Sequence, residues 1–327
     1  MKLMITGGAG FIGSNFVRMV ISDALPGLEG AEVTVFDALT YSGTLSNLES
    51  VAGSERFRFI KGDIRDKKAV DEAVPGHDAI VHFAAESHVD RSVSDSRVFV
   101  ETNVLGTQTL LDSALKSGTA RFVHVSTDEV YGSIDEGSWD EEEPLLPNSP
   151  YAASKAASDL LVRSYHVTHQ LNTSITRCSN NYGTHHFPEK LIPLFITNLL
   201  DGLTVPLYGD GQNIRDWLHV DDHCRGIALV LQQGRAGQIY NIGGGTELSN
   251  NELTHMLLAA TGKDESSIRP VADRKGHDRR YSVDIAKISS ELGYHPQVDF
   301  ASGLADVVQW YREHRAWWEP LKEPAAL

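Results

Sequence analysis

Tyr151 and Lys155 are the residues whose types and spacing most directly indicate chemistry. They lie four positions apart, so a helix would place the phenol and the ammonium on one face. A positive charge near a phenol lowers its pKa, which makes the tyrosine usable as a base near neutral pH. Thr127, which follows Ser126 at the end of a predicted strand, offers a hydroxyl that can hydrogen-bond a substrate alcohol. Because a Tyr-x-x-x-Lys spacing also occurs on ordinary surface helices, these residues indicate a catalytic site only in combination.

A glycine pattern near the N-terminus predicts a dinucleotide site. Gly7, Gly10 and Gly13 follow one predicted strand and open a predicted helix. Glycines let the backbone approach a pyrophosphate closely, and the helix N-terminus supplies N–H groups and the positive end of a dipole. Asp37, after the next predicted strand, can bind the ribose diol of adenosine and would repel a 2′-phosphate. The three residues after it contain no arginine to bind such a phosphate: Ala38, Leu39 and Thr40. We therefore predict NAD rather than NADP; the alternative for Asp37 is a carboxylate that caps its own loop.

These residues need an alternating succession of strands and helices to position them. Apolar runs predict strands over 2–6, 32–36, 57–60, 79–83, 122–126 and 174–177, with helices between them over 11–22, 67–74, 94–116 and 151–169. Such a succession indicates a parallel sheet with right-handed crossovers, the doubly wound, Rossmann-type α/β fold. Asp63 and Ile64 then lie after the third strand, where they would bound the adenine. The residues after the fourth strand would run beneath the cofactor: Phe83, Ala84, Ala85, Glu86 and Ser87.

The chain changes in character after about residue 180, where short elements are separated by glycine and proline. We predict a cofactor-binding domain over 1–179 and a smaller, mixed α/β lobe over 180–327. The stretch 215–242 keeps strand and helix character, so we expect the chain to return to the first domain there.

Composition excludes several classes of partner. The chain has 327 residues, with 29 Lys and Arg against 44 Asp and Glu, a net charge of −15. Nucleic acids and anionic membranes need a cationic face, so we expect neither as a partner. Only Cys178 and Cys224 are cysteines, which argues against disulfides and a cysteine-based metal site and favours a reducing cytoplasm. The N-terminal uncharged run is too short to span a membrane, and we predict no metal site.

Four segments extend the pattern beyond the glycine loop and the Tyr-x-x-x-Lys helix. They are STDEVYG at 126–132, AESHVD at 85–90, NNYG at 180–183 followed by PEKLIP at 188–193, and RKGHDRRY at 274–281. With them the chain resembles the extended short-chain dehydrogenase/reductase family over nearly its whole length, and within it the dTDP-glucose 4,6-dehydratases. Thr184, His185 and His186 depart from that resemblance, since this family usually has a proline and other polar residues there.

The resemblance implies the conversion of dTDP-α-D-glucose to dTDP-4-keto-6-deoxy-D-glucose and water. It implies Tyr151 as the base for the 4-hydroxyl, Asp128 as the acid for the departing 6-hydroxyl and Glu129 as the base for the C5 proton. Thr127 would hydrogen-bond the 4-oxygen, and Lys155 would support the tyrosine. The alternative is that Asp128 and Glu129 form an ordinary acidic turn. Neighbours in a strand point to opposite faces, so both reach one sugar only if the chain turns there.

The resemblance also implies binding residues and an assembly. For NAD they are Gly7, Gly10, Phe11, Ile12, Gly13, Asp37, Ala38, Leu39, Thr40, Asp63, Ile64, Phe83, Ala84, Ala85, Ser87, Thr102, Tyr151, Lys155 and Asn181. For the nucleotide sugar they are Ser87, Thr127, Asn180, Glu189, Lys190, Leu191, Pro206, Leu207, Tyr208, Arg215, Asn250, Arg274, His277 and Tyr281. Members of the family pair through two long helices, here 94–116 and 151–169, so we expect a homodimer. The apolar residues at helical spacing in these helices would serve that contact or face the sheet: Val100, Val104, Leu111, Leu160 and Leu161.

Two other functions remain open from the sequence. One is a sugar-nucleotide 4-epimerase, or a dehydratase acting on another nucleotide sugar. The other is a non-catalytic NAD-binding sensor, which would need the glycine loop but not Thr127, Tyr151 and Lys155.

Overall fold

Seven parallel strands form the central sheet of the structure, a computed structural model that describes residues 1–274 and 276–322. Their order across the sheet is β10-β6-β5-β4-β1-β2-β3. The strands are β1 (Lys2–Thr6), β2 (Glu32–Asp37), β3 (Phe57–Lys61), β4 (Ala79–His82), β5 (Arg121–Thr127), β6 (Thr173–Cys178) and β10 (Ile239–Ile242). Every residue of β4, β5 and β6 is buried, as expected for a parallel sheet covered on both faces. The predicted doubly wound fold is confirmed.

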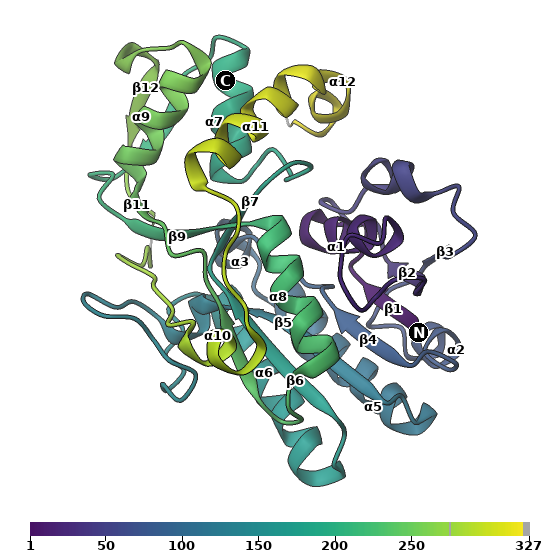
Figure 1. Ribbon diagram of the computed structural model, residues 1–327. Helices are drawn as coiled ribbons and strands as arrows, with labels where there is room; N and C mark the ends of the chain where they lie inside the picture. The colour runs from purple at the N-terminus through teal and green to yellow at the C-terminus, as the bar shows by residue number, and fades with distance from the viewer. Residues whose placement is uncertain (275, 323–327) are drawn as a thin grey trace.

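Helices cover both faces of this sheet (Figure 1). One face packs against α1 (Phe11–Ile21), the short 3-10 helix η1 (Leu45–Val51), α8 (Val220–Gln233) and α10 (Ala286–Leu292). The other face packs against α2 (Lys67–Ala73), α5 (Thr107–Ser117) and α6 (Pro150–His169). Strand β10 and helix α8 lie within the stretch 215–242, where the chain was expected to return to the first domain. Helix α10 also packs on the first domain, in the layer of α1 and α8, and the sequence had not indicated this second return.

The helix predicted over 94–116 is broken near its start. Helix α3 (Val89–Ser94) ends at Ser94, and Asp95 is extended, with φ −144° and ψ 94°. The Asp95 carboxylate accepts a hydrogen bond from the backbone N–H of Arg97, which fixes a turn in place of a continuing helix. The chain then runs through α4 (Arg97–Phe99), the π-helical segment η2 (Val100–Gly106) and α5.

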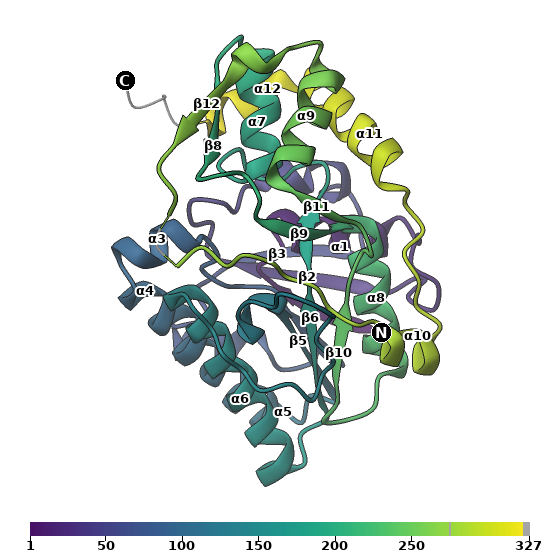
Figure 2. The ribbon, with the colours of Figure 1, turned by 90° about the vertical axis from the view of Figure 1, so that its left-hand side faces the viewer.

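The second lobe lies beyond the carboxyl ends of the sheet strands (Figures 1 and 2). It contains a small sheet of β7 (Asn180–Tyr182), β9 (Ile214–His219) and β11 (Glu247–Ser249), and a parallel pair of β8 (Val205–Tyr208) and β12 (Ile268–Val271). Its helices are α7 (Leu191–Leu200), α9 (Asn250–Thr261), α11 (Phe300–Glu313) and α12 (Arg315–Trp318), with short 3-10 turns η4 (Glu265–Ser267) and η5 (Glu319–Leu321). These elements share their own apolar core, which includes Phe195, Leu257 and Trp318.

Two negative findings apply to the described ranges 1–274 and 276–322. No helix in them is both long enough and apolar enough to cross a bilayer. No group of three or more His, Cys, Asp or Glu side chains in them is arranged to hold a metal ion.

Candidate active site

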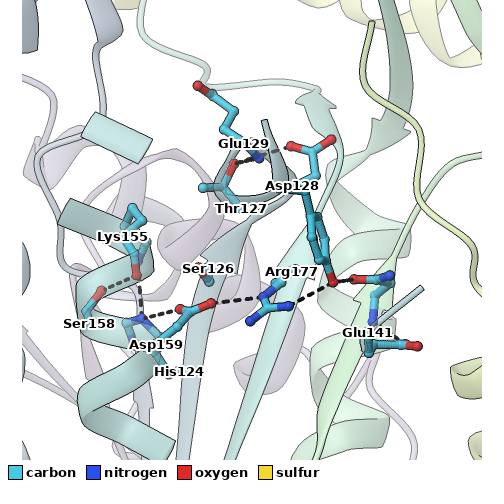
Figure 3. A network of polar contacts seen from close by, with 12 residues as sticks. His124, Ser126, Thr127, Asp128, Glu129, Glu141, Lys155, Ser158, Asp159 and Arg177 are labelled. Carbon is cyan, nitrogen blue, oxygen red and sulfur yellow. Dashed lines mark hydrogen bonds and ion pairs between the residues drawn. The ribbon is translucent and has the colours of Figure 1, made fainter. Parts of the chain in front are cut away.

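The two acidic residues after β5 lie on a turn. The strand ends at Thr127, and the 3-10 turn η3 (Asp128–Tyr131) begins at the next residue. The Thr127 hydroxyl caps this turn by accepting the backbone N–H of Glu129 at 3.3 Å, and it donates to Asp128 Oδ1 at 3.3 Å. Asp128 and Glu129 therefore do not alternate across a strand, and Figure 3 shows their carboxyl groups diverging above the end of β5.

Burial shapes the protonation of both carboxyl groups. It is the largest cause that raises the pKa of Asp128 well above its ordinary value, and the neighbouring charges of Glu129 and Asp216 add to it. The pKa of Glu129 is also raised by burial, but the positive charges of Lys190 and Arg215 oppose that rise. The arrangement therefore favours a protonated Asp128 beside a more readily ionised Glu129, the combination that an acid and base pair requires.

The phenol and the ammonium come from α6, whose start is well defined. Ser149 caps the helix by accepting the backbone N–H of Ala152 at 3.1 Å, and Pro150 occupies the first turn. Tyr151 and Lys155 are 9% and 4% exposed, and both line the same cleft as Thr127.

The structure corrects one expectation about this pair. Burial, followed by the charges of Glu129 and Cys178, raises the pKa of Tyr151 well above its ordinary value. The Lys155 ammonium donates to the backbone carbonyl of Val125 at 2.8 Å. In the protein alone the Tyr151 pKa is therefore raised, and not lowered as its spacing from Lys155 had indicated.

The glycine loop has the tight geometry expected beneath a pyrophosphate. Gly7 has φ +69°, and a Cβ there would lie 2.5 Å from the backbone nitrogen of Ala84. A Cβ on Gly13 would lie 2.3 Å from the carbonyl oxygen of Gly7. Side chains are therefore excluded at both positions, and the first turn of α1 faces an open cleft.

Asp37 both caps its loop and faces the cleft. Its two carboxylate oxygens accept the backbone N–H groups of Ala9 at 2.9 Å and of Leu39 at 2.8 Å. Each oxygen keeps a further lone pair, and the residue lines the cleft, so it can still accept hydrogen bonds from a ribose diol. The loop-capping alternative and the binding role are thus compatible.

The cofactor cleft has a volume of about 310 Å³ along the carboxyl ends of the strands, where ligands bind in open α/β sheets. All but one of the predicted cofactor residues line it. Leu39, the exception, has φ +54° and packs against the core beneath the sheet. Gly62, which precedes Asp63 and Ile64 and was expected to bound the adenine with them, lines the cleft as well. The cleft also contains residues that were not predicted to bind the cofactor: Phe36, Tyr41, Ser42, Gly43, Arg65, Val125, Cys178, Ser179, His186 and Phe187.

A second cavity of about 650 Å³ opens between the first cleft and the second lobe. It is lined by all of the predicted nucleotide-sugar residues except Thr127, which lines the first cleft. The two cavities share residues at their junction: Ser87, Glu129, Asn180, Phe187, Glu189 and Lys190. Glu129 is therefore at the place where one ligand would approach the other.

Arginines and aromatic rings gather in this second cavity. The Arg274 guanidinium lies 4.6 Å from the ring centroid of Tyr208, and that of Arg215 lies 4.2 Å from the ring of Tyr281. Stacked guanidinium groups of this kind suit a diphosphate beside an aromatic base. Lys275, from the fourth sequence motif, lies outside the described residues.

The segment that departs from the family pattern joins the two lobes. His186 stacks on Phe11 of α1, with ring centroids 4.0 Å apart and an interplanar angle of 9°. His185 has φ +61° and packs against Trp310 and Trp317, with centroids at 4.4 and 5.4 Å. Burial lowers the pKa of His185 to about 3, so it is neutral in this contact.

Asn103 is a site-supporting residue that sequence reasoning missed. It lies in the π-helical segment η2 and exchanges two hydrogen bonds with the backbone of Glu86, at 2.8 and 3.0 Å. It also donates to Ser154 of α6 at 2.8 Å. Asn103 thus fixes the segment 83–87, which lines the first cleft, to helix α6. An asparagine inside a helical pattern was the available signal.

Comparison with known proteins gives relatives over almost the whole chain. The model of the family described as "GDP-mannose 4,6 dehydratase" matches residues 4–307. A dTDP-glucose 4,6-dehydratase from Streptomyces niveus is 59% identical over 324 residues, covering 99% of this chain and 96% of the relative. Another from Streptomyces antibioticus is 60% identical over 327 residues, covering 100% of this chain and 97% of the relative.

Solved structures agree with these relatives. The crystal structure of DesIV, a dTDP-glucose 4,6-dehydratase from Streptomyces venezuelae with NAD and TYD bound, has a TM-score of 0.97 and 64% identity, covering 98% of this chain and 100% of that one. A UDP-glucose 4-epimerase from Thermotoga maritima with UDP-glucose has a TM-score of 0.87 and 30% identity, covering 96% and 99%. Together with the motifs around Asp128 and Tyr151, these matches show that the chain belongs to the dTDP-glucose 4,6-dehydratases within the GDP-mannose 4,6-dehydratase family.

Proposed function

We propose that the protein is a hydro-lyase that converts dTDP-α-D-glucose to dTDP-4-keto-6-deoxy-D-glucose and water with NAD as its cofactor. The observation that carries the proposal is the turn η3. It presents Asp128 and Glu129 to the cleft that Tyr151 and Lys155 also line. Relatives that are 59% and 60% identical are dTDP-glucose 4,6-dehydratases, and the related crystal structure of DesIV holds NAD.

The chain's own residues would divide the proton transfers among them. Tyr151 takes the proton of the 4-hydroxyl, while Thr127 holds the 4-oxygen by a hydrogen bond. The resulting C4 ketone acidifies the C5 hydrogen, which Glu129 removes as a proton. Asp128, kept protonated by its burial, gives its proton to the departing 6-hydroxyl, because hydroxide alone is a poor leaving group. Glu129 then returns its proton to C5.

NAD would lie along the glycine loop. Held there, it would supply a hydride acceptor for C4 and a hydride donor for C6, with no net redox change over the reaction. Asp37 would hold the adenosine ribose, and Asp63 with Ile64 would border the adenine. The exclusion of side chains at Gly7 and Gly13 supports this position for a pyrophosphate.

The nucleotide part of the substrate would occupy the second cavity. Arg215 and Arg274 would bind the diphosphate, and Tyr208 would flank the base. The other contributors would come mainly from the lobe over 180–327, which we propose as the substrate-binding domain beside a cofactor domain over 1–179. They are Ser87, Asn180, Glu189, Lys190, Leu191, Pro206, Leu207, Asn250, His277 and Tyr281.

We also propose a homodimer in the cytoplasm. Val100 of η2 and Leu160 of α6 are 49% and 58% exposed, and the exposed apolar residues Leu105 and Val167 lie on the same two segments. Apolar side chains gathered on two adjacent helical segments are typical of a subunit contact. Leu111, which we had grouped with them, is fully buried in the core beside the sheet. The two free, buried cysteines suit a reducing compartment.

Product analysis distinguishes this proposal from the alternatives. Purified protein is incubated with dTDP-glucose, and the products are separated and weighed by mass spectrometry. A dehydratase gives a product lighter by one water molecule. An epimerase gives an isomer of unchanged mass. This alternative is tested because a UDP-glucose 4-epimerase of 30% identity shares the fold. A sensor gives no turnover, and either of these last results would refute the proposal.

A further inference from the structure

A chain of buried polar side chains, none of which lines either cavity, leads away from Lys155 (Figure 3). The Lys155 Nζ atom is 3.5 Å from Nε2 of His124, which is 3.4 Å from Oδ1 of Asp159. The other carboxylate oxygen of Asp159 accepts the Nε–H of Arg177 at 2.9 Å. Lys155 and Asp159 are one helical turn apart on α6, while His124 and Arg177 come from the neighbouring strands β5 and β6.

This chain is almost completely withdrawn from water. The side chains of His124 and Asp159 are each 1% exposed, and that of Arg177 is 3% exposed. The Arg177 guanidinium also donates to the hydroxyl of Tyr131 at 2.9 Å, and that hydroxyl donates to the amide oxygen of Asn241 at 2.9 Å. Arg177 is therefore fixed from two sides, and it holds the Asp159 carboxylate in one orientation.

The ion pair with Arg177 engages only one of the two Asp159 oxygens. Oδ1 points toward the imidazole of His124 and has no hydrogen-bond partner within normal geometry in the described chain. Burial lowers the pKa of His124 to about 4, with the charge of Lys155 as the next cause, so this imidazole is neutral. A neutral imidazole leaves the negative charge of Asp159 acting on Lys155 without cancelling it.

Lys155 needs such a charge because burial works against its ammonium form. Burial lowers the pKa of Lys155 to about 8, and the charge of Asp159 is the largest cause acting in the opposite direction, followed by Cys178. The titratable groups that face it from the packed elements are His82 on β4, His124 on β5, Cys178 and Arg177 on β6, and Tyr151 and Asp159 on its own helix. Among these, Asp159 is the carboxylate, and its own pKa is lowered, since Arg177 and His124 outweigh the effect of burial.

We propose that Asp159 is a positioning residue for the reaction: its buried carboxylate keeps Lys155 in the ammonium form behind Tyr151, with His124 as a neutral spacer and Arg177 as its anchor. The inference rests on the proposed function, because the ammonium matters only if Tyr151 must become an anion. Asp159 touches neither cavity, so it acts through Lys155 alone.

The test follows the first hydride transfer as a function of pH. Rapid mixing of the NAD-loaded protein with dTDP-glucose, monitored by NADH absorbance, gives the rate of oxidation across the neutral and alkaline range. Asp159→Asn removes the charge that raises the Lys155 pKa, so Lys155 loses its proton at a lower pH. The plot of the oxidation rate against pH falls at high pH, where Lys155 loses its proton. In Asp159→Asn this alkaline limb should move down by about one pH unit or more, the usual effect of losing a nearby opposite charge. KM for dTDP-glucose should stay unchanged.

Ser158→Ala is the matched control, because it removes a buried hydrogen bond to the Lys155 carbonyl, 2.8 Å long, without changing any charge. Its alkaline limb should stay in the wild-type position. Asp159→Asn leaves Arg177 unpaired and can prevent folding, so the double variant Asp159→Asn, Arg177→Gln removes both charges together. It should show the same downward shift.

Three results would overturn the inference: a wild-type alkaline limb in Asp159→Asn, a wild-type limb in the folded double variant, or an equal shift in Ser158→Ala. Each of these results counts only if the wild-type protein, measured in parallel, reduces its NAD and forms product. A wild-type protein that does neither would instead refute the proposed function.

Discussion

At the scale of single residues, the carboxyl pair after β5 decides the chemistry. Asp128 and Glu129 differ in environment, since the positive charges of Lys190 and Arg215 favour ionisation of Glu129 while Asp128 has mainly negative neighbours. In the proposed mechanism neither carboxyl takes part in the first hydride transfer, which depends on Tyr151, Thr127 and Lys155. Oxidation of the substrate and loss of water should therefore be separable by mutation.

Asp128→Asn and Glu129→Gln should each slow dehydration by about 100-fold or more, as for removal of a general acid or base. Bound NAD should still be partly reduced on addition of dTDP-glucose, which gives an NADH absorbance without product. Tyr151→Phe should block oxidation and show no NADH absorbance. The assignment fails if either carboxyl variant dehydrates at the wild-type rate. It also fails if neither carboxyl variant reduces NAD while Tyr151→Phe does.

Residues whose roles depend on distant partners were the hardest to predict. The glycines, Asp37, Tyr151 and Lys155 carry local patterns, so their spacing was enough to single them out. His124 looked like part of an apolar strand, and Asp159 and Arg177 come from different elements. Nothing in a single sequence pairs them. Leu39 was included for its place after Asp37, but its backbone N–H serves that carboxylate while its side chain packs inward.

At the scale of elements, the alternation of apolar runs was sufficient to predict the sheet. Six predicted strands correspond to β1 to β6 within one residue or two. The strands β4, β5 and β6 are wholly buried runs in a covered parallel sheet, while the edge strand β3 (Phe57–Lys61) has no buried residue. The break at Asp95 was not predicted, since a side-chain hydrogen bond to the backbone fixes it. The π-helical segment η2 was not predicted either. The turn between β1 and α1, in contrast, was predicted from its glycines, and it can be tested directly by substitution.

Gly13→Ala should weaken NAD binding, because its Cβ would lie 2.3 Å from the carbonyl oxygen of Gly7 and the loop would have to move. Strain of this kind costs about 1 to 3 kcal/mol, so we expect a loss of affinity for NAD of roughly 5-fold to 150-fold. Calorimetric titration of NAD into stripped protein measures this. Gly53→Ala is the control, since a Cβ there meets nothing within 4 Å. Unchanged affinity in Gly13→Ala would contradict the position given to the pyrophosphate.

At the scale of the whole molecule, the C-terminal lobe is connected to the glycine loop. The indole of Trp317 donates to Oδ1 of Asn47 at 3.0 Å, and the Asn47 amide donates to the carbonyl of Ala9 at 2.9 Å. His186 stacks on Phe11 in the first turn of α1. These contacts hold the two lobes together across the cofactor cleft, which suits a cofactor that returns to its starting state in every cycle.

We therefore expect the purified protein to carry NAD without any being added, measured by denaturing it and assaying the supernatant. Trp317→Phe keeps an aromatic ring but removes the hydrogen bond to Asn47, so it should retain less NAD. Trp310→Phe is the control, because Trp310 belongs to the same aromatic cluster and its ring packs against His185, Tyr311, His314 and Trp317 instead of bonding to Asn47. Near-zero NAD in the wild type, with turnover proportional to added NAD, would contradict this expectation.

The proposed homodimer is the other expectation at the scale of the whole molecule. Light scattering should give twice the 35.9 kDa mass of the chain at micromolar concentration. Leu160→Glu places a charge on the exposed apolar face of α6 and should shift the protein to monomer. Leu203→Glu is the control, because Leu203 is 44% exposed in the second lobe, away from α6. A monomeric wild type, or equal dissociation by both variants, would refute the contact.

The central claim is that one hydride leaves C4, stays on NAD within the protein and returns to C6 of the same sugar. The most direct test is to incubate dTDP-glucose carrying deuterium at C4 with the NAD-loaded protein and to locate the label in the product by NMR. The account predicts a 4-keto-6-deoxy product with the deuterium at C6. Loss of the label to water, or a product of unchanged mass that keeps the deuterium at C4, would contradict it.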